Sequence, residues 1–120
     1  MITLKNLASK SLQEVFDQVA NHLLRQRFRS KNGSICAYRS AEGWKCAAGC
    51  LIGDDEYNSD MEGKEWKILV EEGMVPKAHA KAIGALQKIH DYGIEADWES
   101  ELRDFAKGAN LEFRICSETH

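Results

Sequence analysis

Ser34 to Tyr57 is the one strand-like stretch in a chain that is otherwise patterned as amphipathic helix. Its two short runs, residues 35–39 and 44–48, are separated by the four residues Ser40-Ala41-Glu42-Gly43. A four-residue connection that contains glycine is typical of a β-hairpin. Residues 47–52 are small and then apolar, which predicts a short buried turn of helix after the hairpin. We therefore expect this stretch to form the centre of the fold.

Apolar residues at three- and four-residue spacing predict four helices on the two sides of this stretch. The predicted helices span residues 11 to about 28, 64–72, 76–92 and 97–107. Ser11 and Glu14 form a capping-box pattern at the start of the first helix, and Asn32-Gly33 marks its end. Pro76 is predicted to be the first residue of the third helix. Gly84 and the alanines near it imply that this helix closely approaches another element, such as the first helix.

The last part of the chain predicts one more strand. Leu111, Phe113 and Ile115 alternate with polar residues, as expected of a third strand beside the hairpin. At 120 residues the chain is long enough to bury a core of its own, and it contains no low-complexity run that would act as a linker. We therefore predict a single domain, residues 1–120, with a mainly helical α+β fold around a small antiparallel sheet.

The composition limits where the protein is expected to reside and which classes of partner it can bind. No apolar stretch approaches the roughly 20 residues that span a bilayer, and no long apolar segment follows the first lysine, as a secretory signal would require. We therefore expect a cytoplasmic protein that does not enter the membrane. The formal net charge of −3 argues against a nucleic-acid binder, which needs a basic face.

The cysteines suggest a zinc site as the first chemical hypothesis. Cys36, Cys46 and Cys50 follow the spacing C-x9-C-x3-C, and His90 or His22 would complete four ligands. Structural zinc sites usually contain a closely spaced pair such as C-x2-C, which this chain lacks. A reducing cytosol also disfavours disulfides. The alternative, that the cysteines are small buried hydrophobic residues, agrees better with their apolar neighbours.

A reactive thiol is the second chemical hypothesis. A cysteine at a helix N-terminus can have a lowered pKa, and a histidine can serve as its base. Cys46 or Cys50 together with His90, which Asp91 follows, fits that description on paper. No cluster of glycines typical of an oxyanion hole accompanies them, and C-x3-C differs from the C-x-x-C of dithiol redox proteins. The sequence therefore favours a protein without enzymatic activity.

Aromatic and basic side chains suggest two binding surfaces. Tyr38, Arg39, Trp44 and Lys45 belong to the residue types that anchor protein interfaces, and they lie on the predicted hairpin. Arg25 to Lys31 holds four basic residues with an interleaved phenylalanine, a pattern that can hold a phosphate backbone and stack a base. The same arginines would also stabilise the C-terminus of a helix through its dipole, so they need no nucleic-acid ligand. The protein interface is therefore the preferred hypothesis.

Residues of the central stretch also make up a recognisable pattern. The motifs are C-x-Y-R from Cys36, G-x-K-C-A-x-G-C-L-I from Gly43, D-x-Y from Asp55 and M-E-G from Met61. With these motifs the chain resembles small uncharacterised proteins encoded by tailed phages and prophages, over most of its length. It departs from them at Gly53, where a proline is expected. The resemblance implies no catalytic residues, but it implies a partner, because small accessory phage proteins often bind and block a host or defence protein.

Together these observations predict a non-enzymatic cytoplasmic protein of the phage type. We expect it to act by binding another protein, and to inhibit a host or anti-phage defence protein in that way. A cysteine-centred site, with zinc or a reactive thiol, is the first alternative. Weak nucleic-acid binding through Arg25 to Lys31 is the second.

Overall fold

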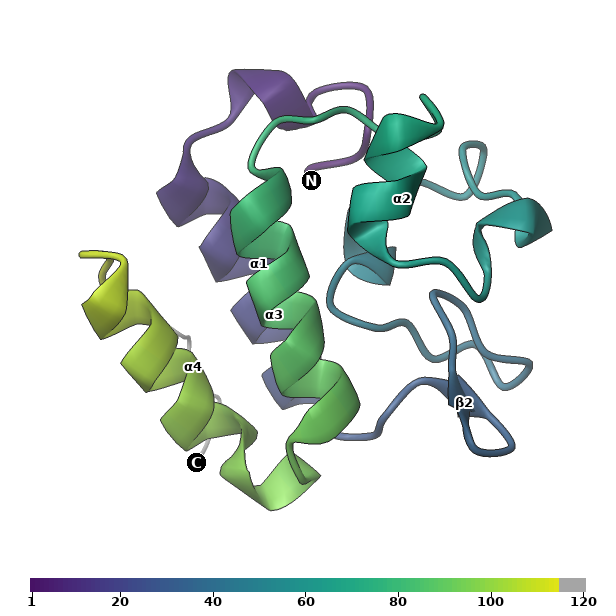
Figure 1. The fold of residues 1–120 in the computed structure, drawn as a ribbon. Coiled ribbons are helices and arrows are strands. Elements are labelled where there is room, and N and C mark those ends of the chain that lie inside the picture. The colour runs from purple at the N-terminus through teal and green to yellow at the C-terminus, as the bar shows by residue number, and fades with distance from the viewer. Residues whose placement is uncertain (115–120) are drawn as a thin grey trace.

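The computed structural model describes residues 1–114, which form four α-helices and one small antiparallel sheet (Figure 1). The helices are α1 (Leu12–Gln26), α2 (Trp66–Glu71), α3 (Ala80–Tyr92) and α4 (Trp98–Gly108), and the strands are β1 (Lys31–Asn32) and β2 (Ile35–Cys36). The predicted α+β class, mainly helical around a small antiparallel sheet, is confirmed. No helix among these residues is long and apolar enough to cross a membrane.

Three of the helices form one half of the molecule, and loops with α2 form the other (Figure 1). Helix α3 lies across α1, α4 contacts both of them, and α2 packs against the opposite flank of α3. The core between them is anchored by large buried side chains, above all Trp66 of α2, Trp98 of α4 and Phe16 of α1. Burial of such side chains is the main force that holds a fold of this size together.

Helix α1 begins as the sequence predicts and ends earlier. The Ser11 hydroxyl accepts from the Glu14 N–H at 3.1 Å, and the Glu14 carboxylate accepts from the Ser11 N–H at 2.9 Å, which completes the capping box. The helix stops at Gln26, because Arg27 adopts the left-handed conformation with φ 62°. The predicted stop signal, Asn32-Gly33, instead lies at the turn between β1 and β2, where Gly33 has φ 65°.

The hairpin lies earlier in the chain than the sequence predicts. Strand β1 pairs with β2, whereas the predicted strands 35–39 and 44–48 meet only in one bridge between Arg39 and Lys45. The backbone groups of these segments find other partners. The Tyr38 N–H donates to the Glu62 carboxylate at 2.9 Å, and the Lys45 N–H donates to the side chain of Gln26 at 3.0 Å. Because the N–H groups are already satisfied, the sheet extends no further. The predicted buried turn of helix is confirmed as a 3-10 turn at Gly49–Leu51.

Helix α3 begins later than the sequence predicts. Pro76 is not its first residue, because the helix starts at Ala80 after His79, which has a left-handed φ of 59°. A hydrogen bond of 2.7 Å between His79 Nε2 and the Lys10 carbonyl holds that residue in place. The start of α3 is thus fixed by a distant contact that periodicity does not reveal.

The predicted third strand is also absent from residues 111–114. This segment pairs with a side chain of α1 instead of a strand, since the Glu112 N–H donates to Gln13 Oε1 at 2.9 Å. Gln13 Nε2 in turn donates to the Glu112 carbonyl at 2.9 Å. Ile115, the last residue of the predicted strand, lies outside the described residues.

The motif residues of the central stretch bind one another around one carboxylate. Glu62 accepts the N–H of Tyr38 and of Arg39, at 2.9 and 3.1 Å, and the Tyr57 hydroxyl at 2.6 Å. We call these four residues the Glu62 clasp. The backbone of Gly49 packs directly against Tyr38. A Cβ at this position would lie 2.2 Å from the Tyr38 carbonyl oxygen, so only glycine fits. The pattern C-x-Y-R, G-C-L-I, D-x-Y and M-E-G is therefore accounted for in large part by folding.

Replacing Glu62 by alanine is expected to lower the free energy of unfolding by about 2–3 kcal/mol, since two backbone donors and a hydroxyl lose a charged acceptor. Glu62→Gln keeps one acceptor oxygen and should lose less. Urea unfolding followed by circular dichroism measures both. Glu71, an exposed acid that makes no hydrogen bond or ion pair with the described residues, supplies the control, and Glu71→Ala should change stability by less than about 0.5 kcal/mol. An equal effect of the two alanine variants would contradict the role of the clasp.

Candidate functional site

An open groove of about 810 Å³ lies between α2, α3 and the segment that contains β2. Its lining includes the buried side chains of Tyr38, Cys46 and Trp66. It also includes Ile35 and Tyr92, which are 67% and 81% exposed and are among the most exposed large hydrophobic residues of the described chain. A concave surface whose lining is mainly apolar and partly exposed is the usual form of a site that binds another molecule.

Gly84 lies in the middle of α3 and lines this groove. A glycine in a helix interior costs about 0.5–1 kcal/mol of stability relative to alanine. A Cβ on Gly84 would meet no atom within 4 Å, so no described element approaches this position. The predicted close approach is therefore wrong at Gly84, although α3 does contact α1, α2 and α4. Together with Ala80 and Ala85, which also line the groove, the glycine gives α3 a surface of small side chains.

The charge around the groove differs in sign from that of the whole chain. Four lysines and three carboxylates line it, a net charge of +1 in a chain whose net charge is −3. Lys64 pairs with Glu72 at 2.8 Å. Lys67, Lys81 and Lys88 are exposed and form no ion pair with any described residue. Three ammonium groups are thus available to a ligand in the groove, and so are the exposed carboxylates of Glu65 and Glu71, which form no ion pair with described residues either.

Cys36, His90 and Asp91 form the one polar cluster of metal-binding type in residues 1–114. One ligand atom from each lies within 4.8 Å of the others. Strand β2 supplies the cysteine and the C-terminal turn of α3 supplies the other two. Cys36 and Asp91 line the groove, whereas His90 is fully buried behind it. The sequence predicts Cys36 and His90 as metal ligands. Asp91 is noted there only as the residue that follows His90.

The hydrogen bonds of His90 fix the position of its proton. The Ser30 N–H donates to His90 Nε2 at 2.9 Å, so this nitrogen carries a lone pair. His90 Nδ1 therefore holds the proton and donates to Asp91 Oδ1 at 2.8 Å. A metal ion at Nδ1 would displace that proton to Nε2, where it would face the Ser30 N–H. Neither ring nitrogen is free to act as a base for the thiol.

The three described thiols have pKa values that favour the neutral form. Burial raises the pKa of Cys36 to about 11, and the neighbouring Asp91 carboxylate adds to the rise. Burial also raises the pKa of Cys46, and it raises that of Cys50 to about 12. A nucleophilic cysteine needs the opposite shift. These environments are those of packed thiols.

The structure does not bring Cys46 and Cys50 to the cluster of Cys36 and His90. The Cys46 sulfur accepts the Gly49 N–H at 3.3 Å, and the Cys50 thiol donates to the Ala47 carbonyl at 3.2 Å. Both bonds belong to the 3-10 turn. His22, the other predicted ligand, bonds the Lys45 carbonyl through Nε2 at 2.8 Å. The predicted set of four ligands is thus divided between separate places.

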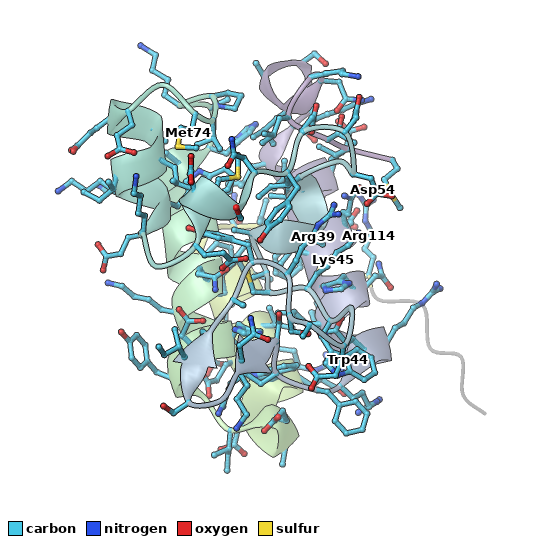
Figure 2. The ribbon with its side chains drawn as sticks, turned by 90° about the vertical axis from the view of Figure 1, so that its right-hand side faces the viewer. Arg39, Trp44, Lys45, Asp54, Met74 and Arg114 are labelled. Atoms are coloured by element: carbon cyan, nitrogen blue, oxygen red, sulfur yellow. The ribbon has the colours of Figure 1, made fainter. Side chains whose placement is uncertain are left out.

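The predicted interface residues also lie in separate places (Figure 2). Arg39 and Lys45 gather at Asp54, at 2.8 and 3.9 Å, and Trp44 lies apart from them toward the lower end of this view. Arg39 also donates to the Ile52 carbonyl at 2.9 Å, and its guanidinium lies over the Tyr57 ring. Tyr38 is only 6% exposed, and its hydroxyl donates to the Lys64 carbonyl at 2.6 Å. Of this set, Tyr38 lines the groove.

Comparisons with known proteins assign no family to the chain. No family model, no curated protein and no solved structure matches it significantly. The functional argument therefore depends on the geometry of residues 1–114.

Alkylation of the native protein is expected to be slow and confined to Cys36. With a pKa of about 11, this thiol holds roughly 200-fold less thiolate at pH 8 than an ordinary cysteine of pKa about 8.5. The rate with iodoacetamide should rise about tenfold per pH unit up to about pH 10. The raised pKa values also predict that stability declines as the pH rises above about 8.5, because the unfolded thiols ionise first.

Mass spectrometry of a Cys116→Ser background measures this rate, because Cys116 lies outside the described residues. Adding Cys36→Ser should abolish labelling of the native state, whereas Cys46 and Cys50 should react only after unfolding. Rapid alkylation of any of the three at pH 7 would support the reactive-thiol alternative.

Zinc is expected to bind weaker than micromolar, because a ligand at His90 Nδ1 would break the bonds to Asp91 and Ser30. Titration against a chromophoric chelator at pH 7.5 measures this affinity. Retention of one zinc ion per chain after dialysis, with loss in both Cys36→Ser and Asp91→Asn, would establish the zinc alternative instead. Cys50→Ser is the matched control, since this thiol is outside the cluster.

Proposed function

We propose that this chain is a non-enzymatic protein that binds a partner protein by holding an amphipathic helix of that partner in the groove between α2 and α3. The observation that carries the proposal is Gly84, a helix-interior glycine that faces open space on an apolar groove. A residue that costs stability where no part of the fold requires it is explained when a ligand requires the space.

The shape of the groove favours a helical occupant. The distance between packed helices depends on the side chains at the contact, and small residues allow the closest approach. Gly84 with Ala80 and Ala85 offers such a contact along α3, and the buried Trp66 of α2 lies on the other side. Ile35 and Tyr92 add exposed apolar side chains to the lining. An amphipathic helix laid in an apolar groove is a recurrent mode of recognition.

The charges favour an acidic helix. Lys67, Lys81 and Lys88 have no ion pair with described residues, and Lys81 and Lys88 lie seven residues apart on the same face of α3. Glutamates that flank the apolar face of a partner helix would meet these ammonium groups. Such pairs contribute more to orientation and association rate than to affinity.

The polar groups at the groove support binding rather than catalysis. The Cys36 thiol has a raised pKa, and both ring nitrogens of His90 have partners inside the protein. The resemblance to small phage proteins favours a host or defence protein as the partner, with inhibition as the result of binding. The predicted surface residue Tyr38 contributes to this groove, whereas Arg39, Trp44 and Lys45 lie outside its lining.

Two substitutions of Gly84 test the groove. Gly84→Ala adds one methyl group in open space and should raise the free energy of unfolding by about 0.5–1 kcal/mol. It should weaken capture of the partner less than Gly84→Leu does, because one methyl group takes only part of the space left for the partner helix. Gly84→Leu should also fold, but its side chain would fill the groove. It should weaken partner binding at least tenfold, or about 1.4 kcal/mol.

Partner binding by wild type, Gly84→Ala and Gly84→Leu is measured by affinity capture from lysate of a bacterial host. Mass spectrometry quantifies the captured proteins. The partner is the protein that wild type holds, that Gly84→Ala holds more weakly and that Gly84→Leu loses. Calorimetry with that purified protein then gives the affinities. Capture that Gly84→Leu leaves unchanged would contradict the proposal. Light scattering tests the other occupant: a dimer that Gly84→Leu dissociates would assign the groove to a second copy of this chain.

A further inference from the structure

Phe28 and Trp44 form an exposed aromatic pair outside the groove. Their ring centroids are 5.1 Å apart with an interplanar angle of 32°. Phe28 is 56% exposed, whereas Trp44 is partly buried. Phe28 follows α1 and Trp44 comes from the loop before the 3-10 turn, at the lower end of the face in Figure 2. We call this pair the Phe28–Trp44 platform.

Three cations close to Phe28 in the chain have no partner among the described residues. Arg25, Arg27 and Lys31 are exposed, and their side chains make no hydrogen bond or ion pair within residues 1–114. Arg29 differs, because its guanidinium donates to the carbonyls of His90 and Gly93 and lies 4.0 Å from Glu95. Arg29 therefore supports the fold, and the other three cations are available to a ligand.

The conformation of Arg27 gives an independent reason to look for a ligand here. With φ 62° it occupies the left-handed region that glycine adopts without strain at a helix end. A side chain with a Cβ loses roughly 1 kcal/mol in this conformation. His79, which has a similar φ, is held by a hydrogen bond to Lys10. The Arg27 side chain makes no hydrogen bond or ion pair among the described residues.

We propose that the Phe28–Trp44 platform binds single-stranded nucleic acid. Bases stack on the two rings, and the phosphates between them meet Arg25, Arg27 and Lys31. A strand fits better than a duplex, because only an unpaired base can place its face on a side-chain ring. The site shares no residue with the groove lining, and so it does not depend on the groove function.

The size of the site sets what affinity to expect. Three phosphate contacts on a single strand give a slope of log K against log salt of roughly −2. The net charge of −3 opposes binding in part, since the Debye length at 30 mM salt is roughly 18 Å. Glu42, exposed two residues before Trp44, is the nearest acid in sequence and would weaken the contact. Binding should thus be weak, should involve only a few nucleotides and should not depend on the nucleotide sequence.

Trp44 supplies the readout. The other two tryptophans, Trp66 and Trp98, are 2% and 1% exposed, so quenching of fluorescence by a stacked base reports on Trp44. The probes are a 15-nucleotide oligo(dT), the corresponding oligo(U), a 15-base-pair duplex and a 15-residue poly-glutamate, each at 30 mM salt. Both single strands should quench saturably with a salt slope of roughly −2. The duplex and poly-glutamate should bind at least fivefold more weakly.

Three variants separate stacking from charge. Phe28→Ala should weaken binding fivefold or more. Arg27→Gly suits the left-handed φ, so it should fold at least as well as wild type while the salt slope falls by about 0.7. Glu42→Gln should tighten binding. Lys107→Gln removes an exposed charge near the C-terminal end of α4 and should change nothing, as the matched control.

Several results would overturn the proposal. No saturable quenching at 30 mM salt would do so, as would quenching that Phe28→Ala and Arg27→Gly leave unchanged. Equal binding of poly-glutamate would show a surface for acidic protein segments, and equal binding of the duplex would show contact with phosphates alone.

Discussion

The loop half of the molecule depends on one carboxylate. Glu62 gathers the backbone of residues 38 and 39 and the hydroxyl of Tyr57, three groups from segments that pair with no extended sheet. Buried backbone N–H groups without partners are costly, so a chain that gives up strand pairing needs another acceptor. The clasp also shapes the groove. Tyr38, held at its N–H by Glu62, uses its hydroxyl to fix the Lys64 carbonyl just before α2, and Cys36 lies two residues earlier on the groove lining.

The sequence predicts features that local interactions decide and misses those that distant ones decide. The capping box of Ser11 and Glu14, the apolar face of α1 and the 3-10 turn follow from neighbours a few residues apart, and all are found. The hairpin is misplaced because Glu62, 24 residues beyond Tyr38, satisfies the N–H that a strand would have used. Prediction of the cysteine site fails for the same reason. Cys36 and Asp91 are far apart in sequence, and spacing alone cannot show that they meet while Cys46 and Cys50 stay apart.

Gly84 and Arg27 contradict their local backbone in opposite ways. Gly84 is flexible where α3 would gain from a side chain, and Arg27 has a side chain where the end of α1 would gain from glycine. Each costs on the order of 1 kcal/mol, a sizeable share of the stability of a small domain. Gly84 faces open space, and the Arg27 side chain makes no hydrogen bond or ion pair with the described residues. Each residue lies on a surface with exposed aromatic or apolar neighbours. Local conflicts of this kind are expected at binding sites rather than at random positions.

The cysteines illustrate how burial decides between chemistry and packing. A thiol beside a histidine and an aspartate has the composition of a reactive or metal site, yet composition does not fix the protonation state. At Cys36 burial, and after it the neighbouring aspartate, raises the pKa of the thiol. The Ser30 N–H commits the histidine to a tautomer that can neither accept the thiol proton nor bind a metal without losing two hydrogen bonds. Ser30 is fully buried, and its hydroxyl also donates to the carbonyls of Ala37 and Trp44. The same serine therefore joins the groove to the loop of the Phe28–Trp44 platform, and it anchors both surfaces through structure rather than through reactivity.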